Sequence, residues 1–412
     1  MADETGEGLA RGLTNYGDKD FSLYLRRSFA KAMGFTSESL KKPIVGIADT
    51  ASSYNNCHRN VPEQIEAVKR GVLAAGGLPM VFPTVSLAET FLHPTSMLYR
   101  NLMSMDTEEM ISAQPMDAAV VVGGCDKTVP AQLMGAISAN RPTVQLITGP
   151  MMIARHEGER LGACTDCRRF WAMYRAGELN DQQIVAVESR LATTAGTCPV
   201  MGTASTMACI AETLGMALPG TAAIPAVHAD RLRAAEESGK RAVEIARSGL
   251  TPDKVVTEKS VENALRVLLA IGGSTNGIIH LTAIAGRAGV NVSLDRLNEI
   301  SDETPVLVNL KPSGDHYMED FFAGGGLGAV LREIEHLLHL DTLSITGETL
   351  GDRLSEAPGY IDPDIVRPFA EPHYPLGGLV SLFGTLAPNG AILKRAAADD
   401  TLFECEGRAV VF

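Results

Sequence analysis

Short apolar runs alternate with amphipathic segments through the first 150 residues of the chain. The apolar runs lie at 44–49, 78–85, 118–122 and 143–148, and polar or glycine-rich loops follow them. Uninterrupted apolar runs of this length are typical of strands that are buried on both faces. Helix-like segments between the runs then indicate βαβ units, so the pattern predicts a parallel sheet.

The helix-like segments have the apolar spacing of surface or core helices. In the first half of the chain they lie at 21–33, 62–75, 95–110 and 130–138. Residues 151–300 read mainly as helix, with the clearest segments at 201–218 and 278–288. A further strand-like run lies at 305–312. We therefore expect an α/β fold with a large α/β/α domain.

The pattern changes near the C-terminus. Prolines crowd residues 355–375, which is typical of a linker, and short strand-like runs follow at 377–383, 391–393 and 409–412. Turn residues between these runs predict β-hairpins. We divide the chain into an α/β domain at 1–370 and the beginning of a β-barrel-like domain at 371–412. The last run would leave an exposed apolar edge, so we expect a truncated domain or a covering chain.

Composition narrows the class of protein. The chain has 412 residues, a formal charge of -13 and 7 cysteines. An acidic chain is a poor candidate for binding nucleic acid, and no apolar stretch is long enough for a membrane span. The acidic, glycine-rich start does not resemble a signal peptide, and an odd number of scattered cysteines favours reduced thiols or metal ligands. These features predict a cytoplasmic protein.

Chemically active residues follow the ends of the predicted strands. Cys57, Glu89 and the run Cys125-Asp126-Lys127 each come shortly after one of these strands. The carboxyl ends of parallel strands share one edge of the sheet, so we expect these side chains to converge there. The glycines at 123–124 and the helix that follows also favour close approach of a ligand to the backbone.

Three cysteines on turns, Cys57, Cys125 and Cys198, suggest ligands for a soft metal or an iron–sulfur cluster. From spacing alone, three unrelated buried thiols are the favoured alternative. Glu89 and Asp126 suggest oxygen ligands for magnesium. Lys127 could join them only as a carbamate, and a surface ion pair between these groups is the favoured alternative on residue types alone.

Other candidate sites have weaker support. Cys164 and Cys167 form a Cys-x-x-Cys unit, but no second unit accompanies it, so a zinc or dithiol role has little support. The turn at 272–276 could bind an anion at a helix N-terminus or serve as an ordinary N-cap. Acid–base histidines could be His58, His156, His228 and His280. None of these histidines has a clear partner in the sequence.

Several motifs resemble those of the dihydroxy-acid and sugar-acid dehydratases. The run at 125–131 resembles the family signature, and the segments at 196–208, 270–281 and 309–314 follow in the same order. The resemblance covers nearly the whole chain. It implies an iron–sulfur cluster on Cys57, Cys125 and Cys198, and magnesium on Glu89, Asp126 and carbamylated Lys127. These expectations reverse the alternatives that spacing alone favours.

The resemblance also implies a reaction. Such enzymes remove water from a 2,3-dihydroxy acid, with magnesium at the carboxylate and C2 hydroxyl and the cluster iron at the C3 hydroxyl. The segment at 89–102 looks closest to the sugar-acid branch, such as arabinonate and xylonate dehydratases. It therefore favours a [2Fe-2S] cluster over [4Fe-4S], an aldonate substrate and a 2-keto-3-deoxy product. A homodimer or homotetramer is also expected from the family.

The chain departs from the family pattern in its details. His58 directly follows Cys57 and Asn60 comes later, whereas the family often has the asparagine first. The resemblance places the catalytic base, a serine, in the C-terminal domain, beyond the part present here. We expect a sugar-acid dehydratase. The alternatives are a dihydroxy-acid dehydratase of branched-chain amino-acid synthesis and a truncated, inactive homologue that binds a cluster.

Overall fold

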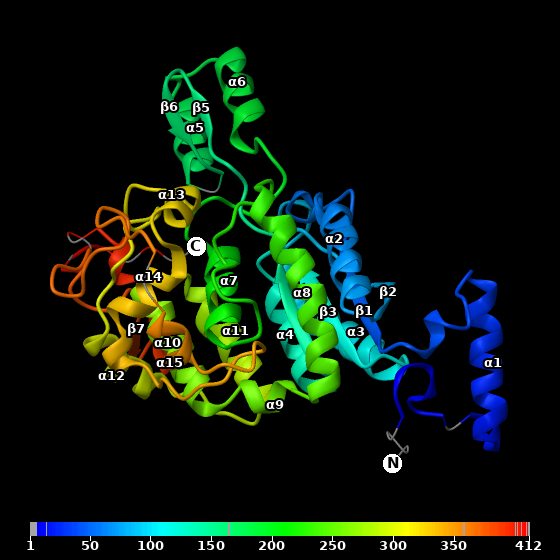
Figure 1. Ribbon diagram of the computed structural model, residues 1–412. Helices are drawn as coiled ribbons and strands as arrows, with labels where there is room; N and C mark the ends of the chain where they lie inside the picture. The colour runs from blue at the N-terminus through cyan, green and yellow to red at the C-terminus, as the bar shows by residue number, and fades with distance from the viewer. Residues whose placement is uncertain are drawn as a thin grey trace.

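The computed structural model of the chain describes residues 6–13, 15–163, 165–356 and 359–399, with positions 401, 403, 404, 406–408 and 410 beyond them. Cys164 and most of the predicted strand at 409–412 lie outside the described residues. The fold is α/β, as the sequence predicts (Figure 1).

Within the described part of the chain, the central sheet has four parallel strands in the order β2-β1-β3-β4. The strands are β1 (Ile44–Asp49), β2 (Leu78–Pro83), β3 (Ala118–Gly123) and β4 (Thr143–Ile147). The predicted strands are confirmed, with small differences at their ends. The chain passes from β1 to β2 on one side and then returns to β3 on the other, so the strand order reverses between β1 and β3.

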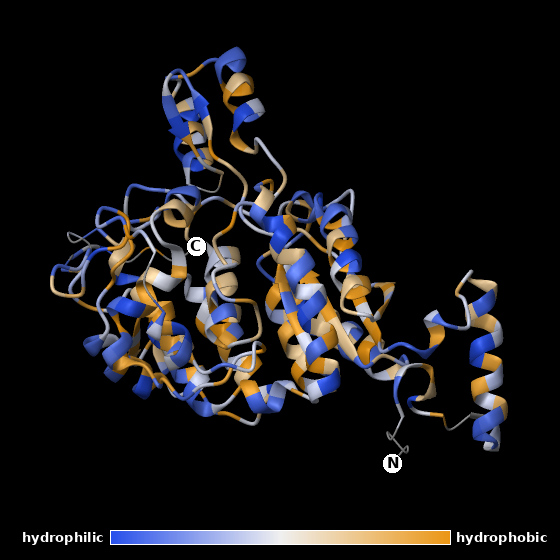
Figure 2. Cartoon of the chain, viewed as in Figure 1, coloured by the Kyte–Doolittle hydropathy of each residue, from blue (hydrophilic) through white to orange (hydrophobic). Residues whose placement is uncertain are grey.

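Helices cover both faces of this sheet. On one face, α2 (Val61–Ala74) and α8 (Ala229–Ser248) pack against the apolar side chains of β1, β3 and β4. The two helices approach closely because Gly71 of α2 and Gly239 of α8 each face the backbone of the other helix. On the other face lies α3 (Arg100–Ala113), which packs along α4 (Thr128–Ala139). Figure 2 shows the apolar strands between these helices.

A second, helical layer holds the largest hydrophobic cluster. Its main helices are α7 (Thr203–Thr213), α10 (Glu258–Ala270), α11 (Thr275–Arg287), α12 (Leu294–Glu303) and α14 (Gly326–Glu333). Shorter helices are α9 (Pro252–Val255), α13 (Met318–Ala323) and α15 (Leu350–Ser355). Because α4 contributes to this cluster, it joins the sheet to the helical layer.

Two parts of the described chain project from the body in Figure 1, α1 and the segment at 154–191. The segment before helix α1 (Lys19–Ala32) is tied to the body at Gly8. The Gly8 N–H donates hydrogen bonds to the Asp117 carboxylate. The segment at 154–191 contains β5 (Ala154–His156), β6 (Glu159–Leu161), α5 (Asp166–Arg175) and α6 (Asp181–Leu191) around a small core of its own. The sequence pattern misses the β5–β6 hairpin, whose strands are only three residues long.

Single turns of 3-10 helix occupy several loops. They are η1 (Gly8–Ala10), η2 (Asn15–Gly17), η3 (Ser39–Lys41), η4 (Asn56–His58), η5 (Glu89–Phe91), η6 (Ser96–Tyr99), η7 (Glu335–Leu337) and η8 (Arg395–Ala397). Of these, η4, η5 and η6 contribute residues to the carboxyl edge of the sheet.

The C-terminal hairpin consists of β7 (Val380–Gly384) and β8 (Ala387–Leu393), as predicted. It packs on α12, where the Asn298 side chain donates to the Ser381 carbonyl at 2.9 Å and accepts from its N–H at 2.7 Å. The domain division at residue 370 stays a prediction.

Two predictions for this half of the chain are wrong. The run at 305–312 is not a regular strand, because Val306 and Val308 form isolated bridges with Tyr374 and Val366. These same bridges attach the proline-rich stretch to the body, so it is not a free linker. Among the described residues, no helix combines the length and apolar character needed to cross a lipid bilayer.

Candidate active site

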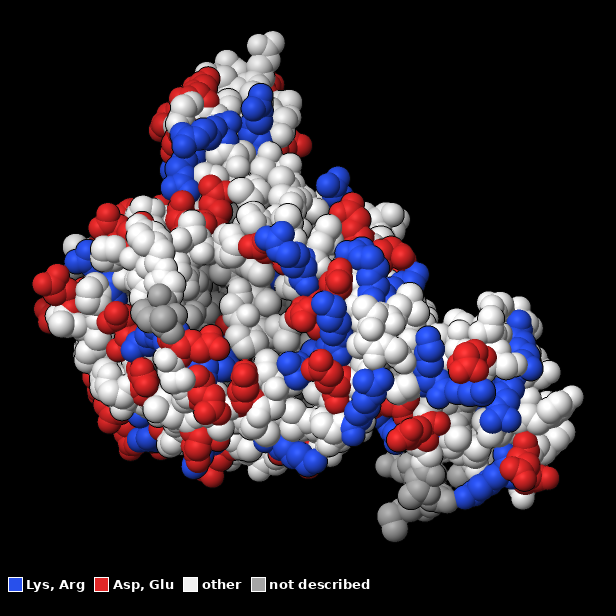
Figure 3. All heavy atoms as spheres, in the orientation of Figure 1, with Lys and Arg blue, Asp and Glu red and all other residues white. Residues whose placement is uncertain are grey.

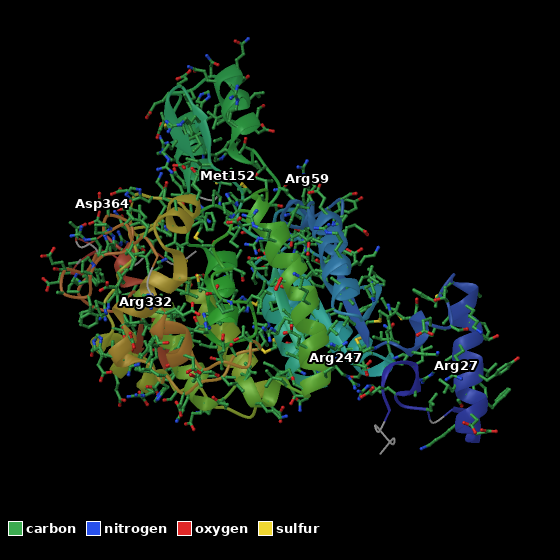
Figure 4. The ribbon with its side chains drawn as sticks, viewed as in Figure 1. Arg27, Arg59, Met152, Arg247, Arg332 and Asp364 are labelled. Carbon is green, nitrogen blue, oxygen red and sulfur yellow. The ribbon has the colours of Figure 1, made fainter. Side chains whose placement is uncertain are left out.

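The carboxyl ends of β1 and β3 lie next to each other, at the point where the strand order reverses. Open α/β sheets bind their ligands in the crevice at such a point. The loop after β1 carries Cys57 in η4, and the turn after β3 carries Cys125. In Figure 4, Arg59 and Met152 lie at this end of the sheet, whereas Arg247 lies toward the other end.

His58 connects the two loops. Its Nε2 atom accepts hydrogen bonds from the backbone N–H groups of Gly124 at 3.1 Å and Cys125 at 3.2 Å. Since an N–H group only donates, Nε2 must carry a lone pair, and the ring proton lies on Nδ1, which donates to the Thr50 carbonyl at 3.0 Å. Burial lowers the pKa of His58 to about 4, so the ring is neutral at pH 7. His58 is therefore a structural link and not an acid–base group.

The thiols of Cys57 and Cys125 are in contact. Cys125 is buried, and a hydrogen bond with the Cys57 side chain, followed by burial, raises the pKa of the Cys125 thiol well above its usual value. The Cys125 Sγ atom also lies 3.4 Å from Asp126 Oδ1. Both thiols are free, so two potential thiolate ligands meet at the switch point.

The segment that carries Cys198 passes beside both loops. The Gly196 N–H donates to the carbonyl of Asn56 at 3.4 Å, and Thr197 packs against Gly124. Cys198 thus directly follows residues that contact Asn56, beside Cys57, and Gly124, beside Cys125. In this structure, however, Cys198 is in a disulfide, so its sulfur is not a free thiol.

Glu89 lies in η5, which follows β2. Its Oε2 atom accepts a hydrogen bond from the Ser96 N–H at 2.9 Å and another from the Ser96 hydroxyl. Burial alone would raise the pKa of Glu89, but the hydrogen bonds from Ser96 and Thr95 and the charge of Lys127 together lower it to about 2. The carboxylate is therefore ionised at pH 7.

Lys127 lies between two carboxylates. Its Nζ atom is 2.6 Å from Asp126 Oδ2 and 3.2 Å from Glu89 Oε2, and its side chain is only 4% exposed. Burial alone would lower the pKa of Lys127, but the charges of Asp126 and Glu89 raise it. The ion pair that sequence composition favours does form, but its lysine is buried.

These groups suit metal ligation in type but are not assembled for it. Among the described residues, no group of three or more His, Cys, Asp or Glu side chains is placed to hold a metal ion. The oxygen set has two carboxylates and the sulfur set has two free thiols. A third ligand would come from carbamylation of Lys127 in the first set and from reduction of the Cys198 disulfide in the second.

A further buried histidine lies near Lys127. His280 of α11 accepts a hydrogen bond at Nδ1 from Arg100 at 3.2 Å. Burial, followed by the charges of Arg100 and Lys127, lowers the pKa of His280 to about 3. At the start of the same helix, the hydroxyls of Thr203 and Ser274 lie 2.8 Å apart, and Ser274 caps the helix as expected for an ordinary N-cap.

The remaining candidates lie elsewhere. Cys167 is half-buried on α5 in the projecting segment, and its Cys-x-x-Cys partner falls outside the described residues. His156 lies on β5 of the same segment, and His228 caps α8 through its side chain. In Figure 3, this segment carries both basic and acidic side chains.

Sequence reasoning missed the residues that hold the site in place. Ser96 orders Glu89, and Arg100 sets the orientation of His280 across 180 positions of sequence. His58 stands beside Cys57 in the sequence, but its contacts with residues 124 and 125 are long-range. No local signal indicates these partners, because each depends on how the strands are ordered.

Comparisons with known proteins match the chain to one family over most of its length. Residues 42–353 match the N-terminal domain, and residues 364–412 the C-terminal domain, of the dihydroxy-acid/6-phosphogluconate dehydratases. An L-arabonate dehydratase of Azospirillum brasilense is 45% identical over 401 residues, which cover 96% of this chain and 69% of that protein.

An L-arabinonate dehydratase of Rhizobium leguminosarum is 42% identical over 400 residues, with the same coverage of both chains. A dihydroxy-acid dehydratase of Desulfosudis oleivorans is 37% identical over 422 residues, which cover 100% of this chain and 73% of that protein. The family matches confirm the resemblance seen in the motifs. The chain therefore belongs to the dihydroxy-acid/6-phosphogluconate dehydratase family, whose members are hydro-lyases.

Proposed function

We propose that this protein removes water from a 2,3-dihydroxy sugar acid and forms a 2-keto-3-deoxy acid. In that reaction the C2 proton and the C3 hydroxyl leave as water, and the resulting enol becomes the ketone. The observation that carries the proposal is the pairing of Glu89 and Asp126 with Lys127, directly beside the contact between Cys57 and Cys125. Hard oxygen ligands and soft thiolates then lie together at one edge of the sheet.

Two cofactors follow from this proposal. Dehydratases of this family use iron–sulfur clusters and magnesium. Here, Cys57, Cys125 and reduced Cys198 would hold the cluster, for which we propose the [2Fe-2S] type. Glu89, Asp126 and carbamylated Lys127 would hold magnesium. When bound, the two groups supply Lewis acidity toward the leaving hydroxyl and the carboxylate end of the substrate.

The charges of the oxygen set support magnesium. In the present structure, two carboxylates and one ammonium give a formal charge of -1. Replacement of the ammonium by a carbamate would give -3, and one Mg²⁺ would return the set to -1. Without the cation, two partly exposed carboxylates and a carbamate on the buried Lys127 side chain would face one another, which is costly. Carbamylation and magnesium binding should therefore occur together.

Hydrogen bonds from neighbouring residues hold parts of this site in place. His58 fixes the turn at Cys125 through backbone hydrogen bonds, and Ser96 holds the Glu89 carboxylate. Thr148 donates to the Cys57 carbonyl at 3.1 Å and so ties the first loop to β4. Because these contacts are made by buried or half-buried groups, the Cys57 loop, the Cys125 turn and the Glu89 carboxylate are each held in place before any substrate binds.

The sugar-acid branch is favoured by the pattern of relatives. Proteins named for arabinonate are 42% and 45% identical to this chain, and the dihydroxy-acid dehydratase compared above is 37% identical. The runner-up is therefore a dihydroxy-acid dehydratase with a branched-chain substrate.

The test is turnover by anaerobically purified, magnesium-loaded protein. The substrates are L-arabinonate, D-xylonate, D-gluconate and 2,3-dihydroxyisovalerate, and the 2-keto acid product is trapped and quantified. We expect product from at least one aldonate and little from the branched acid. Product from 2,3-dihydroxyisovalerate alone would reject the sugar-acid assignment.

A further inference from the structure

His280 carries a buried hydrogen-bond donor that has no acceptor in the described part of the chain. Arg100 donates to its Nδ1 atom, and a guanidinium group can only donate, so Nδ1 has the lone pair and Nε2 has the proton. The side chain is fully buried, and Nε2 has no hydrogen-bond partner among the described residues. A buried donor without an acceptor is rare in folded proteins, so we expect this N–H group to bind an acceptor atom of a ligand.

The unsatisfied donor lies close to Lys127. Helix α11, which holds His280, packs along α4, which begins directly after Lys127. Arg100, the first residue of α3, also donates to the Ile279 carbonyl at 3.4 Å and so ties α3 to α11. The positive charges of Lys127 and Arg100 both act on the imidazole ring of His280.

Other polar atoms in these segments are also unsatisfied. Buried atoms without a partner among the described residues include Nε of Arg100 and Oγ1 of Thr128. Thr128 follows Lys127 directly and is the first residue of α4. Together with His280, these groups supply two N–H donors, the positive charge of Arg100 and a hydroxyl that can donate or accept.

From this arrangement we infer that His280 Nε2–H donates to a carboxylate oxygen that comes to lie beside Lys127. The oxygen has two possible sources, the carbamate formed on Lys127 or the carboxylate of the substrate. The carbamate source rests on the proposed function. There the Lys127 ammonium loses a proton, its nitrogen forms a bond to the carbon of CO₂, and a second proton leaves to solvent.

Neutral His280 suits this role. A neutral donor stabilises the new anion without competing with Glu89 and Asp126 for the metal, and Arg100 keeps the donating nitrogen of the ring turned away from itself. His280 is thus a positioning residue for the ligand set or for the substrate.

Carbon-13 NMR of the whole protein with ¹³C-bicarbonate and magnesium tests the first source. The wild type should show a carbamate signal that Lys127→Arg abolishes, which assigns the signal to Lys127. Loss of a hydrogen bond to a charged group is expected to lower carbamate occupancy about ten- to hundredfold in His280→Phe. His280→Gln keeps an N–H donor and should recover part of the signal.

Binding of L-arabinonate to iron-free protein, measured by calorimetry, tests the second source. If the oxygen belongs to the substrate, the Kd rises about tenfold or more in His280→Phe and the carbamate signal is unchanged. Unchanged carbamate occupancy together with unchanged Kd, in variants that match the wild type in circular dichroism and Tm, would overturn the inference. Neither measurement requires turnover, so a failure of the proposed function would remain distinguishable.

Discussion

The imidazole of His58 holds the backbone of Cys125 in place across the switch point of the sheet. The Cys125 N–H donates to His58 Nε2 at 3.2 Å, and the ring is completely buried. Through this bond, the loop after β1 and the turn after β3 form one rigid unit, and each contributes one thiol to the contact between Cys57 and Cys125.

Replacement of His58 by leucine should damage both stability and cofactor binding. The N–H groups of Gly124 and Cys125 would lose their acceptor, at a cost of about 1–3 kcal/mol each. We expect a lower free energy of unfolding and less iron per chain after anaerobic loading. His316→Gln, at a partly exposed histidine, is the control and should change neither. Equal iron content in His58→Leu and the wild type would contradict this role.

The two buried histidines should make the protein less stable in mild acid. The pKa of His58 is lowered to about 4 and that of His280 to about 3. Below the unfolded pKa of about 6.5, the unfolded chain binds protons that the folded chain does not, so stability falls with pH. For both histidines together, the slope approaches about 2.7 kcal/mol per pH unit between pH 6 and pH 4.

Urea unfolding at several pH values measures this slope. The pKa of Glu89 is lowered to about 2, so this carboxylate adds stability that is lost as the pH falls from its unfolded pKa of about 4.3 to about 2. It therefore contributes to the slope mainly at and below the acid end of this range. His58→Gln and His280→Gln should each reduce the slope by about half. An identical slope in the wild type and both variants would show that the histidines are not neutral in the folded state.

A side chain at position 124 should disturb the turn. A Cβ atom on Gly124 would collide with the side chain of Thr148, which donates to the Cys57 carbonyl. Gly124→Ala should cost about 1–3 kcal/mol through overpacking and should lower iron content. Gly286→Ala, where nothing lies within 4 Å of the new atom, should be neutral or slightly stabilising. Calorimetric Tm and iron analysis of both variants give the comparison.

Lys127→Arg tests the carbamate while it keeps a positive charge for the ion pair. Arginine can keep a positive charge between Glu89 and Asp126, so the Tm should change little. It cannot form the carbamate, and we expect a loss of several kcal/mol of transition-state stabilisation, about 10³-fold in kcat. Initial rates with the preferred aldonate measure this loss. A variant with near-normal kcat would mean that the carbamate is not needed.

The strands could be predicted because each is a short, continuous run of apolar residues. Runs such as 118–122 are stable only when their side chains are buried. The same rule fails at 305–312, where the apolar side chains are also buried but the run pairs with separate loop residues, including Tyr374 and Val366. An apolar run indicates burial, and only the tertiary fold decides whether a neighbouring strand is present.

In the candidate site too, local sequence predicts some features and the tertiary fold decides others. The placement of Cys57 and Cys125 at strand ends was enough to predict that their loops lie at one edge. The sequence predicts that the third helix begins at residue 95, but α3 begins at Arg100. The preceding residues form η6, where Glu89 accepts a hydrogen bond from the Ser96 N–H. Long-range contacts such as Arg100 with His280 have no local signature and required the structure.

We propose that the thiols at the switch point carry an iron–sulfur cluster. The direct measurement is iron and acid-labile sulfide per chain in protein purified without oxygen and with Cys198 reduced. We expect iron and sulfide in the wild type, loss of both elements in Cys125→Ser, and normal loading in Cys167→Ser, whose cysteine lies on the projecting segment. A wild type without iron, or a Cys125→Ser variant that keeps it, would contradict cluster binding at these thiols.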